Sequence, residues 1–172
     1  MLRFVHLLVA SVLSALVGVA GGQTWPDKPV RLISVFPPGG SVDQVARVLA
    51  QQLSKQLGQS VVVENIGGAS GAIGTAAVAK AAPDGYTFGV VFDTHGTNPS
   101  LIPSLSYDTM SGLEHVTLIG TSPMALVASA RSKYMKFTDV NSDARSVKGV
   151  TIGSIGTGSL GHLAMIQVGK QD

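Results

Sequence analysis

The sequence predicts an α/β protein with a mostly parallel sheet covered by helices. Three apolar runs of strand length, at 30–36, 60–64 and 86–92, alternate with two stretches of helical periodicity, at 42–57 and 72–82. Short turns that are rich in glycine or carry Pro-Asp-Gly separate them. Strands that alternate with helices across short connections form a parallel sheet, because each helix carries the chain back across one face through a right-handed crossover.

The first strand is expected to end at Pro37-Pro38-Gly39-Gly40, because neither proline can donate to a strand ladder. Both glycines can adopt positive φ, so a valine at Gly40 is expected to strain the turn. Ser41, with Gln44 three residues later, is typical of a capping box, and the helix should end at Gly58. Backbone N–H groups in this turn and the positive end of the helix dipole predict a seat for an anionic group.

The rest of the chain has a weaker pattern. A second glycine-rich turn lies at 67–71, and the helix at 72–82 stops at Pro83. The stretch 93–103 is rich in Thr, Gly, Asn and Pro, which predicts a loop. Beyond it we expect strands at 116–120, 124–128 and 150–155, a weak helix at 136–148 and a last helix at 159–168.

Residues 1–22 predict a secretory signal peptide. Met1-Leu2-Arg3 is a short positive start, Leu7–Ala20 is an apolar run, and Ala20-Gly21-Gly22 offers small residues for cleavage. A bilayer span prefers about 20 apolar residues, so a membrane anchor is the less favoured interpretation. The mature chain is therefore expected to be soluble and outside the cytoplasm.

Composition excludes several classes of function. The net charge is +2 and the Lys and Arg residues are not clustered, so nucleic acid is not an expected partner. The sequence contains no cysteine, which excludes a lipoprotein anchor, disulfides, thiol catalysis and cysteine metal sites. His95, His115 and His162 lack H-x-x-x-H spacing, so we expect neither a metal site nor a cofactor.

Three motifs give the chain a family resemblance. They are Phe36–Asp43, Val61–Asn65 and Ala79–Thr87, and they resemble the Bug-type periplasmic solute-binding receptors of tripartite tricarboxylate transporters. The resemblance implies a fold like that of type II periplasmic binding proteins, a monomer, a small carboxylate ligand and membrane transporter subunits as partners. Family members have two lobes and roughly twice this length. The chain is therefore expected to hold the first lobe, at 23–115, and an incomplete start of the second, at 116–172, as in a product truncated at its C-terminus.

The resemblance also implies which residues bind the ligand. Backbone amides and hydroxyls, rather than an arginine clamp, are expected to hold it where glycine-rich turns converge at the carboxyl ends of the strands. The residues that match the family's motifs are Pro38, Gly39, Gly40 and Ser41 of the first turn, Thr94, His95 and Asn98 of a Thr-His-x-x-Asn-Pro segment, and Gly156, Thr157, Ser159 and His162 of a Gly-x-Gly-Ser-x-x-His-Leu segment.

Two acids lie beside these segments. Asp43 is favourable to the dipole in the first turn of its helix, and we expect it to be structural. Asp93 stands where the family more usually has a small residue. A carboxylate at that position would repel an anionic ligand unless it points away.

Other interpretations remain open beside a non-catalytic solute receptor. Ser159 and His162 could serve as nucleophile and base in a secreted α/β hydrolase-like enzyme, although the G-x-S-x-G elbow is absent, so we expect no catalytic residue. Residues 156–161 spell the dinucleotide fingerprint, but this fingerprint should open the fold and be followed by an acid about 20 residues later, whereas the given sequence ends eleven residues after Gly161. A non-functional fragment is the third possibility.

Overall fold

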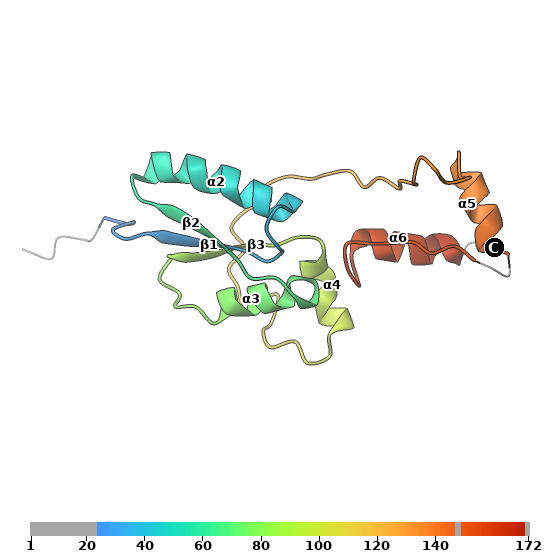
Figure 1. Cartoon of the computed structure of the whole chain (residues 1–172). Coiled ribbons are helices and arrows are strands. Elements are labelled where there is room, and N and C mark those ends of the chain that lie inside the picture. The colour runs from blue at the N-terminus through green and yellow to red at the C-terminus, as the bar shows by residue number, and fades with distance from the viewer. Residues whose placement is uncertain (1–23, 147–148, 171–172) are drawn as a thin grey trace, which may run out of the picture.

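The computed structural model describes residues 24–146 and 149–170, which form a three-stranded parallel sheet in the order β2-β1-β3 (Figure 1). The strands are β1 (Val30–Ser34), β2 (Val61–Asn65) and β3 (Thr87–Val90). The central strand β1 pairs with both neighbours in parallel register. The prediction of an α/β fold with a parallel sheet is confirmed. The expected signal peptide, at 1–22, lies outside the described residues.

Helices cover both faces of the sheet, with α2 on one face and α3 on the other (Figure 1). The other helices follow the sheet in the chain. The helical elements are α2 (Ser41–Leu57), the 3₁₀ turn η2 (Ala69–Gly71), α3 (Ala72–Ala79), α4 (Thr94–Leu101), α5 (Phe137–Ala144) and α6 (Leu160–Gly169). None of the helices within the described residues combines the length and the hydropathy that crossing a bilayer requires.

The core lies between α2 and the sheet. Small residues of the helix, Ala46 and Ala50, are buried against Val30 and Leu32 of the central strand. On the other face, α3 approaches the ends of β1 and β2 closely at Gly74, where an added Cβ would lie 2.3 Å from the carbonyl oxygen of Ile66 and 3.0 Å from the Cα of Val35. These contacts fix both helices against the strands, and therefore fix the turns that join strands to helices at the carboxyl edge of the sheet.

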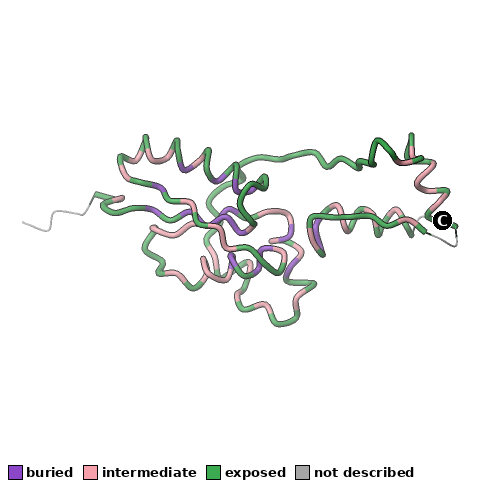
Figure 2. Tube along the Cα trace, in the orientation of Figure 1, coloured by how far each residue is buried: buried purple, intermediate pink, exposed green. Residues whose placement is uncertain are grey.

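The expected strands at 116–120, 124–128 and 150–155 do not form. These segments make no strand pairing within the described residues, and their apolar side chains are largely exposed (Figure 2). Val116 is 72% exposed and Val127 is 83% exposed. An extended segment becomes a strand only when a neighbour completes its hydrogen-bond ladder, which an apolar pattern alone does not guarantee.

The stretch 93–103, expected to be a loop, contains the helix α4. The Asp93 carboxylate accepts from the Thr94 amide at the start of this helix. Thr94 and Asn98, both buried, each donate a hydrogen bond to the carbonyl oxygen of Ser70. These tertiary contacts stabilise a helix that its composition disfavours. The expected weak helix at 136–148, of which 147–148 lie outside the described residues, forms as the shorter α5, and the last helix lies close to its expected place.

The expected capping box at Ser41 is also wrong. The N-cap of α2 is Gly40, and Ser41 is the first helical residue, with no side-chain capping bond. Gln44 instead donates its side-chain amide to the carbonyl oxygen of Gly39, at 3.1 Å. The C-terminal end is as expected, because Gly58 takes the left-handed conformation, with φ of 66°.

We predict that hydrogen exchange will separate the sheet from the end of the chain. The amides of 30–35 and 88–91 should be strongly protected, because the central strand is bonded on both sides and largely buried. Residues 160–168 should exchange fast, because no residue of α6 is buried. Mass-spectrometric exchange measures both, and equal protection in the two regions would contradict this difference.

Candidate functional site

Three glycine-rich turns meet at the carboxyl edge of the sheet. They are turn 1 (37–41), turn 2 (67–71) and turn 3 (156–159). Turn 1 contacts turn 2, because a Cβ added at Gly67 would lie 3.3 Å from the Cδ of Pro37. Turn 3 contacts turn 2 through the Ser70 hydroxyl, which donates to the carbonyl oxygen of Thr157 at 2.9 Å. The expected convergence of the turns is therefore present in the structure.

In turn 1 the two glycines have different conformations. Gly39 has φ of 84°, in the left-handed region, whereas Gly40 has φ of −74° and ψ of 170°. An added Cβ on Gly40 would make only an ordinary contact, 3.5 Å from the carbonyl oxygen of Pro37. The expectation that valine at Gly40 strains the turn is therefore wrong. The position that requires glycine is Gly39.

The amides of turn 1 also differ. Gly39 donates its N–H to the Oδ2 atom of Asp43, at 2.9 Å. Within the described residues, no protein group accepts from the amides of Gly40 and Ser41. These two N–H groups lie at the start of the 17-residue helix α2, in exposed residues. They can donate hydrogen bonds to an anionic oxygen from solution.

Asp43 holds turn 1 in place. Its buried carboxylate accepts from the Arg47 Nε atom at 3.0 Å and from the Asn65 side chain at 2.8 Å, in addition to Gly39. The hydrogen bonds from Arg47, Gly39 and Asn65, in that order, lower the pKa of Asp43 to about 2. The expected structural role of this acid is confirmed.

Thr94 and Asn98 lie behind turn 2. Their side chains both bond the carbonyl oxygen of Ser70, at 2.8 and 3.1 Å. Ser70 itself has a positive φ of 54°, which is uncommon for a residue other than glycine. The two buried side chains therefore fix an unusual backbone conformation at the centre of turn 2.

His95 faces the segment that follows α4. Its Nε2 atom lies 3.4 Å from the Nε2 atom of His115, and its ring stacks on that of Tyr107 at a centroid distance of 6.3 Å. Burial, and then the charge of His115, lowers the pKa of His95. Among the described residues, the buried Nδ1 atom of His95 has no hydrogen-bond partner. His95 is therefore neutral at neutral pH and packs against residues that the sequence motif does not include.

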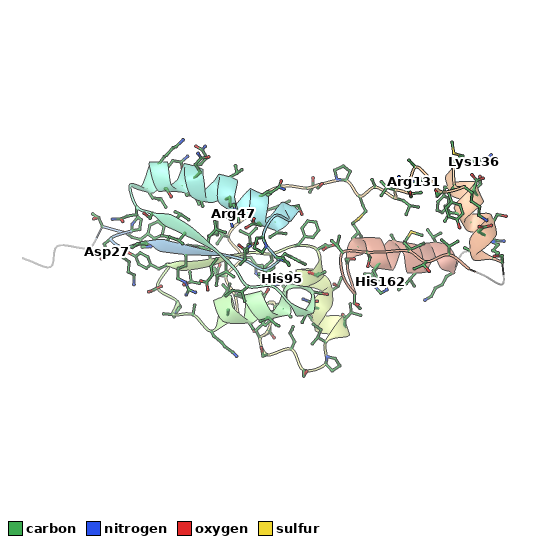
Figure 3. The ribbon with its side chains drawn as sticks, in the orientation of Figure 1. Asp27, Arg47, His95, Arg131, Lys136 and His162 are labelled. Atoms are coloured by element: carbon green, nitrogen blue, oxygen red, sulfur yellow. The ribbon has the colours of Figure 1, made fainter. Side chains whose placement is uncertain are left out.

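Turn 3 leads into α6. Ser159 is buried, and its Oγ atom accepts from the backbone N–H of His162 at 3.3 Å. The Nδ1 atom of the His162 ring accepts from the N–H of Gly158, at 3.1 Å. Figure 3 labels His162 on α6, and also His95 and Arg47. The ring of His162 thus bonds turn 3 and not the Ser159 hydroxyl. A nucleophile and its base require a hydrogen bond between the ring and the hydroxyl.

The dinucleotide fingerprint at 156–161 lacks its expected context. No strand precedes it in the structure, because 150–155 is not paired. Its middle glycine, Gly158, packs on α4, since an added Cβ would lie 2.2 Å from the Cδ1 atom of Leu101. This glycine is therefore explained by a close contact within the protein.

The Asp93 carboxylate bridges α4 and α6. Its Oδ1 atom accepts from the Thr94 amide at 2.8 Å, and its Oδ2 atom accepts from the Leu160 amide at 2.7 Å. The acid therefore points at the start of α6. The sequence motif missed this contact, because it joins residues that are far apart in the chain.

One cavity lies away from turns 1 and 3. It is a groove of about 470 Å³ between α3 and residues 102–106. Apolar side chains such as Ile73 and Leu105 contribute to its lining, with Lys80. Small acids need convergent polar groups, so turns 1 and 3, and not this groove, make the candidate site.

Comparisons with known proteins point to one family. Residues 45–171 match the family described as "Tripartite tricarboxylate transporter family receptor". Protein BugT of Bordetella pertussis is 42% identical over 132 residues, which are 74% of this chain and 40% of that protein. A UPF0065 protein of Agrobacterium vitis is 36% identical over 162 residues, 94% of this chain and 46% of that protein. The chain thus spans less than half the length of these relatives.

A solved structure is similar to about half of the chain. The structure of the periplasmic binding protein BugD is 43% identical, with a TM-score of 0.50, over 51% of this chain and 29% of that one. The α/β architecture with a parallel sheet is therefore that of part of a periplasmic binding protein.

We predict that Asp43→Asn will lower stability at neutral pH, because it removes the charge that Arg47, Asn65 and Gly39 share. The pKa of Asp43 in the folded protein is about 2, below the ordinary value of 3.8 for this carboxyl group, so its stabilisation is present above pH 3.8 and is lost as the pH falls through 2. Urea unfolding across this range, on both chains, measures the difference. Equal stability of the two chains at pH 7 would contradict the role given to Asp43.

Proposed function

Because the chain belongs to the family of tripartite tricarboxylate transporter receptors, we propose that it is a periplasmic solute receptor, or part of one, for a small carboxylate or related polar acid. Its ligand would pass to the membrane subunits of a transporter of that type. We propose that the chain acts as a monomer and needs no cofactor. The chain spans 40% and 46% of two relatives, so transport by the whole protein belongs to this proposal.

One observation carries the proposal. The amides of Gly40 and Ser41 lie at the start of α2, and no group within the described residues accepts from them. The dipole of this helix favours negative charge at that end. A ligand carboxylate that accepts hydrogen bonds from both N–H groups would satisfy the free donors at the start of the helix, and it would need no arginine or lysine.

We propose that the ligand-binding residues have two kinds of role. Residues 38–41 would contact the ligand from one side, and Gly156, Thr157 and His162 from the other. Thr94, Asn98 and Ser159 are buried and bonded to backbone groups, so they would position the turns. His95 contacts His115, and it would support α4 on the side that faces the segment after this helix. No role in catalysis is proposed, because the His162 ring accepts from Gly158.

We also propose that residues 23–115 form the first lobe and that 116–172 begin the second. The exposed apolar segments at 116–120 and 124–128 have the composition of strands without partners. In a two-lobe receptor such strands would pair within the second lobe, and closure of the lobes would exclude water from the ligand.

For export, we predict that the chain is cleaved between Ala20 and Gln23 by a signal peptidase and is recovered without Met1. The apolar run is short and the sequence has no cysteine for lipidation. Mass spectrometry of the mature amino terminus, after expression in a Gram-negative host, identifies the first residue. A product that begins at Met1 and sediments with membranes would contradict export.

For the ligand, we predict weak binding of small carboxylates that depends on turn 1. Affinity should be about millimolar, or about 4 kcal/mol, because only part of a two-lobe receptor is present. Gly39→Ala places a side chain at φ of 84° and should shift the amides of turn 1 and weaken binding. Nuclear magnetic resonance titration with a panel of mono-, di- and tricarboxylates measures the dissociation constants.

Gly58→Ala is the matched control. Gly58 also has a positive φ, of 66°, and an added Cβ at either glycine meets no atom within 4 Å. Each variant should lose about 1 kcal/mol of folding stability. Gly58 lies at the other end of α2, so only Gly39→Ala should weaken binding. Equal affinities in Gly39→Ala and the unchanged protein would show that the site lies elsewhere.

A further inference from the structure

We propose that Asp93 determines the class of acid that the site accepts. Its carboxylate excludes a second ligand carboxylate. It favours ligands with one carboxylate and a second end that donates hydrogen bonds, such as amino acids and acid amides. The inference rests on the proposed function, because it concerns the ligand of that same site.

Asp93 lies three residues beyond the end of β3, beside turn 1. Ser34 of β1 pairs with Val90 of β3 in parallel register, so Asp93 lies as far beyond the edge of the sheet as Pro37 does on the neighbouring strand. The residues just before them keep the two segments together, since the rings of Phe36 and Phe92 pack edge to face at a centroid distance of 6.5 Å. The acid is therefore next to the turn that would hold the ligand.

The Asp93 carboxylate occupies a place that suits an anion. It accepts from the Thr94 amide and from the Leu160 amide, and the second of these lies at the start of the 10-residue helix α6. A ligand carboxylate at that place would have to displace it. A carboxylate can accept about four hydrogen bonds, and these two leave capacity for a donor on the ligand.

The charge of Asp93 is not balanced by a cation. The ion pairs among the described residues are Lys28–Asp84, Arg31–Glu64, Arg47–Asp43 and Lys133–Asp143. None of them includes Asp93. Among the described residues only backbone amides bond this carboxylate, so no cation offsets the repulsion that a second negative charge beside it would meet. An ammonium or amide group in the same place would instead gain a hydrogen bond.

Each end of the ligand then has a distinct partner. The single carboxylate would accept from the amides of Gly40 and Ser41, and the donor end would face Asp93. A dicarboxylate could satisfy only the first of these contacts. Asp93 would thus act on specificity, in addition to the structural contact it makes between α4 and α6.

The test compares succinate with succinamate, which differ only by an amide in place of one carboxylate. We expect the unchanged chain to bind succinamate at least about tenfold more tightly than succinate. Nuclear magnetic resonance titration measures both affinities. Asp93→Asn removes the charge and keeps one acceptor oxygen, and it should abolish most of this preference. The ratio of the two dissociation constants is measured on each chain. A loss of folding stability in a variant weakens the binding of both ligands equally, and it therefore cancels in this ratio.

Two further variants complete the design. Asp93→Ser also removes the charge while keeping a residue suited to the N-cap of α4, and it should act like Asp93→Asn. Asp84→Asn is the matched control, because it removes one negative charge from the turn before β3, at the opposite edge of the sheet. Its preference should equal that of the unchanged chain.

The outcomes separate the two proposals. If acids bind but the preference is unchanged in Asp93→Asn and Asp93→Ser, the role of Asp93 is overturned and the proposed function stands. If the unchanged chain prefers succinate, the role is overturned as well. If neither probe binds any of the chains, the proposed function fails and this inference fails with it.

Discussion

The carboxylate of Asp43 is the interaction on which the rest of the site depends. It joins turn 1, α2 and β2, because it accepts from Gly39, from Arg47 and from Asn65 at once. The same bonds decide which amides of turn 1 are used within the protein and which are available to a ligand. A buried acid with three donors therefore creates a binding surface of backbone N–H groups without contacting the ligand itself.

The carbonyl oxygen of Ser70 has a similar part in turn 2. Thr94 and Asn98 both donate to it, while the Ser70 hydroxyl holds turn 3 at Thr157. Turns that are separated in the sequence are thus connected by single polar groups, at the edge where the parallel strands end. This connection holds the start of α6 near the sheet, although the segments on either side of it are exposed.

The sequence predicts the first part of the fold well, because its signals are local. Apolar runs broken by Pro or Gly predict the strands at 30–36 and 86–92. Such a run is enough to identify a strand when helices cover both faces of the sheet, because most side chains of the strand are then apolar. Prediction from the sequence was wrong where tertiary contacts determine the secondary structure. The helix within 93–103 is held by Ser70, and the segments at 116–128 have strand composition without a neighbour to pair with. The turns of the site were located from motifs, but the bond from Leu160 to Asp93 has no local signal.

The central claim is that two amides of turn 1 hold a ligand carboxylate while their neighbour does not. The amide resonances of Gly39, Gly40 and Ser41 test it most directly, during a titration with succinamate. The largest shifts are expected at Gly40 and Ser41, and a smaller one at Gly39, whose N–H is already bonded to Asp43. Shifts concentrated instead along α3, where the apolar groove lies, would contradict the claim.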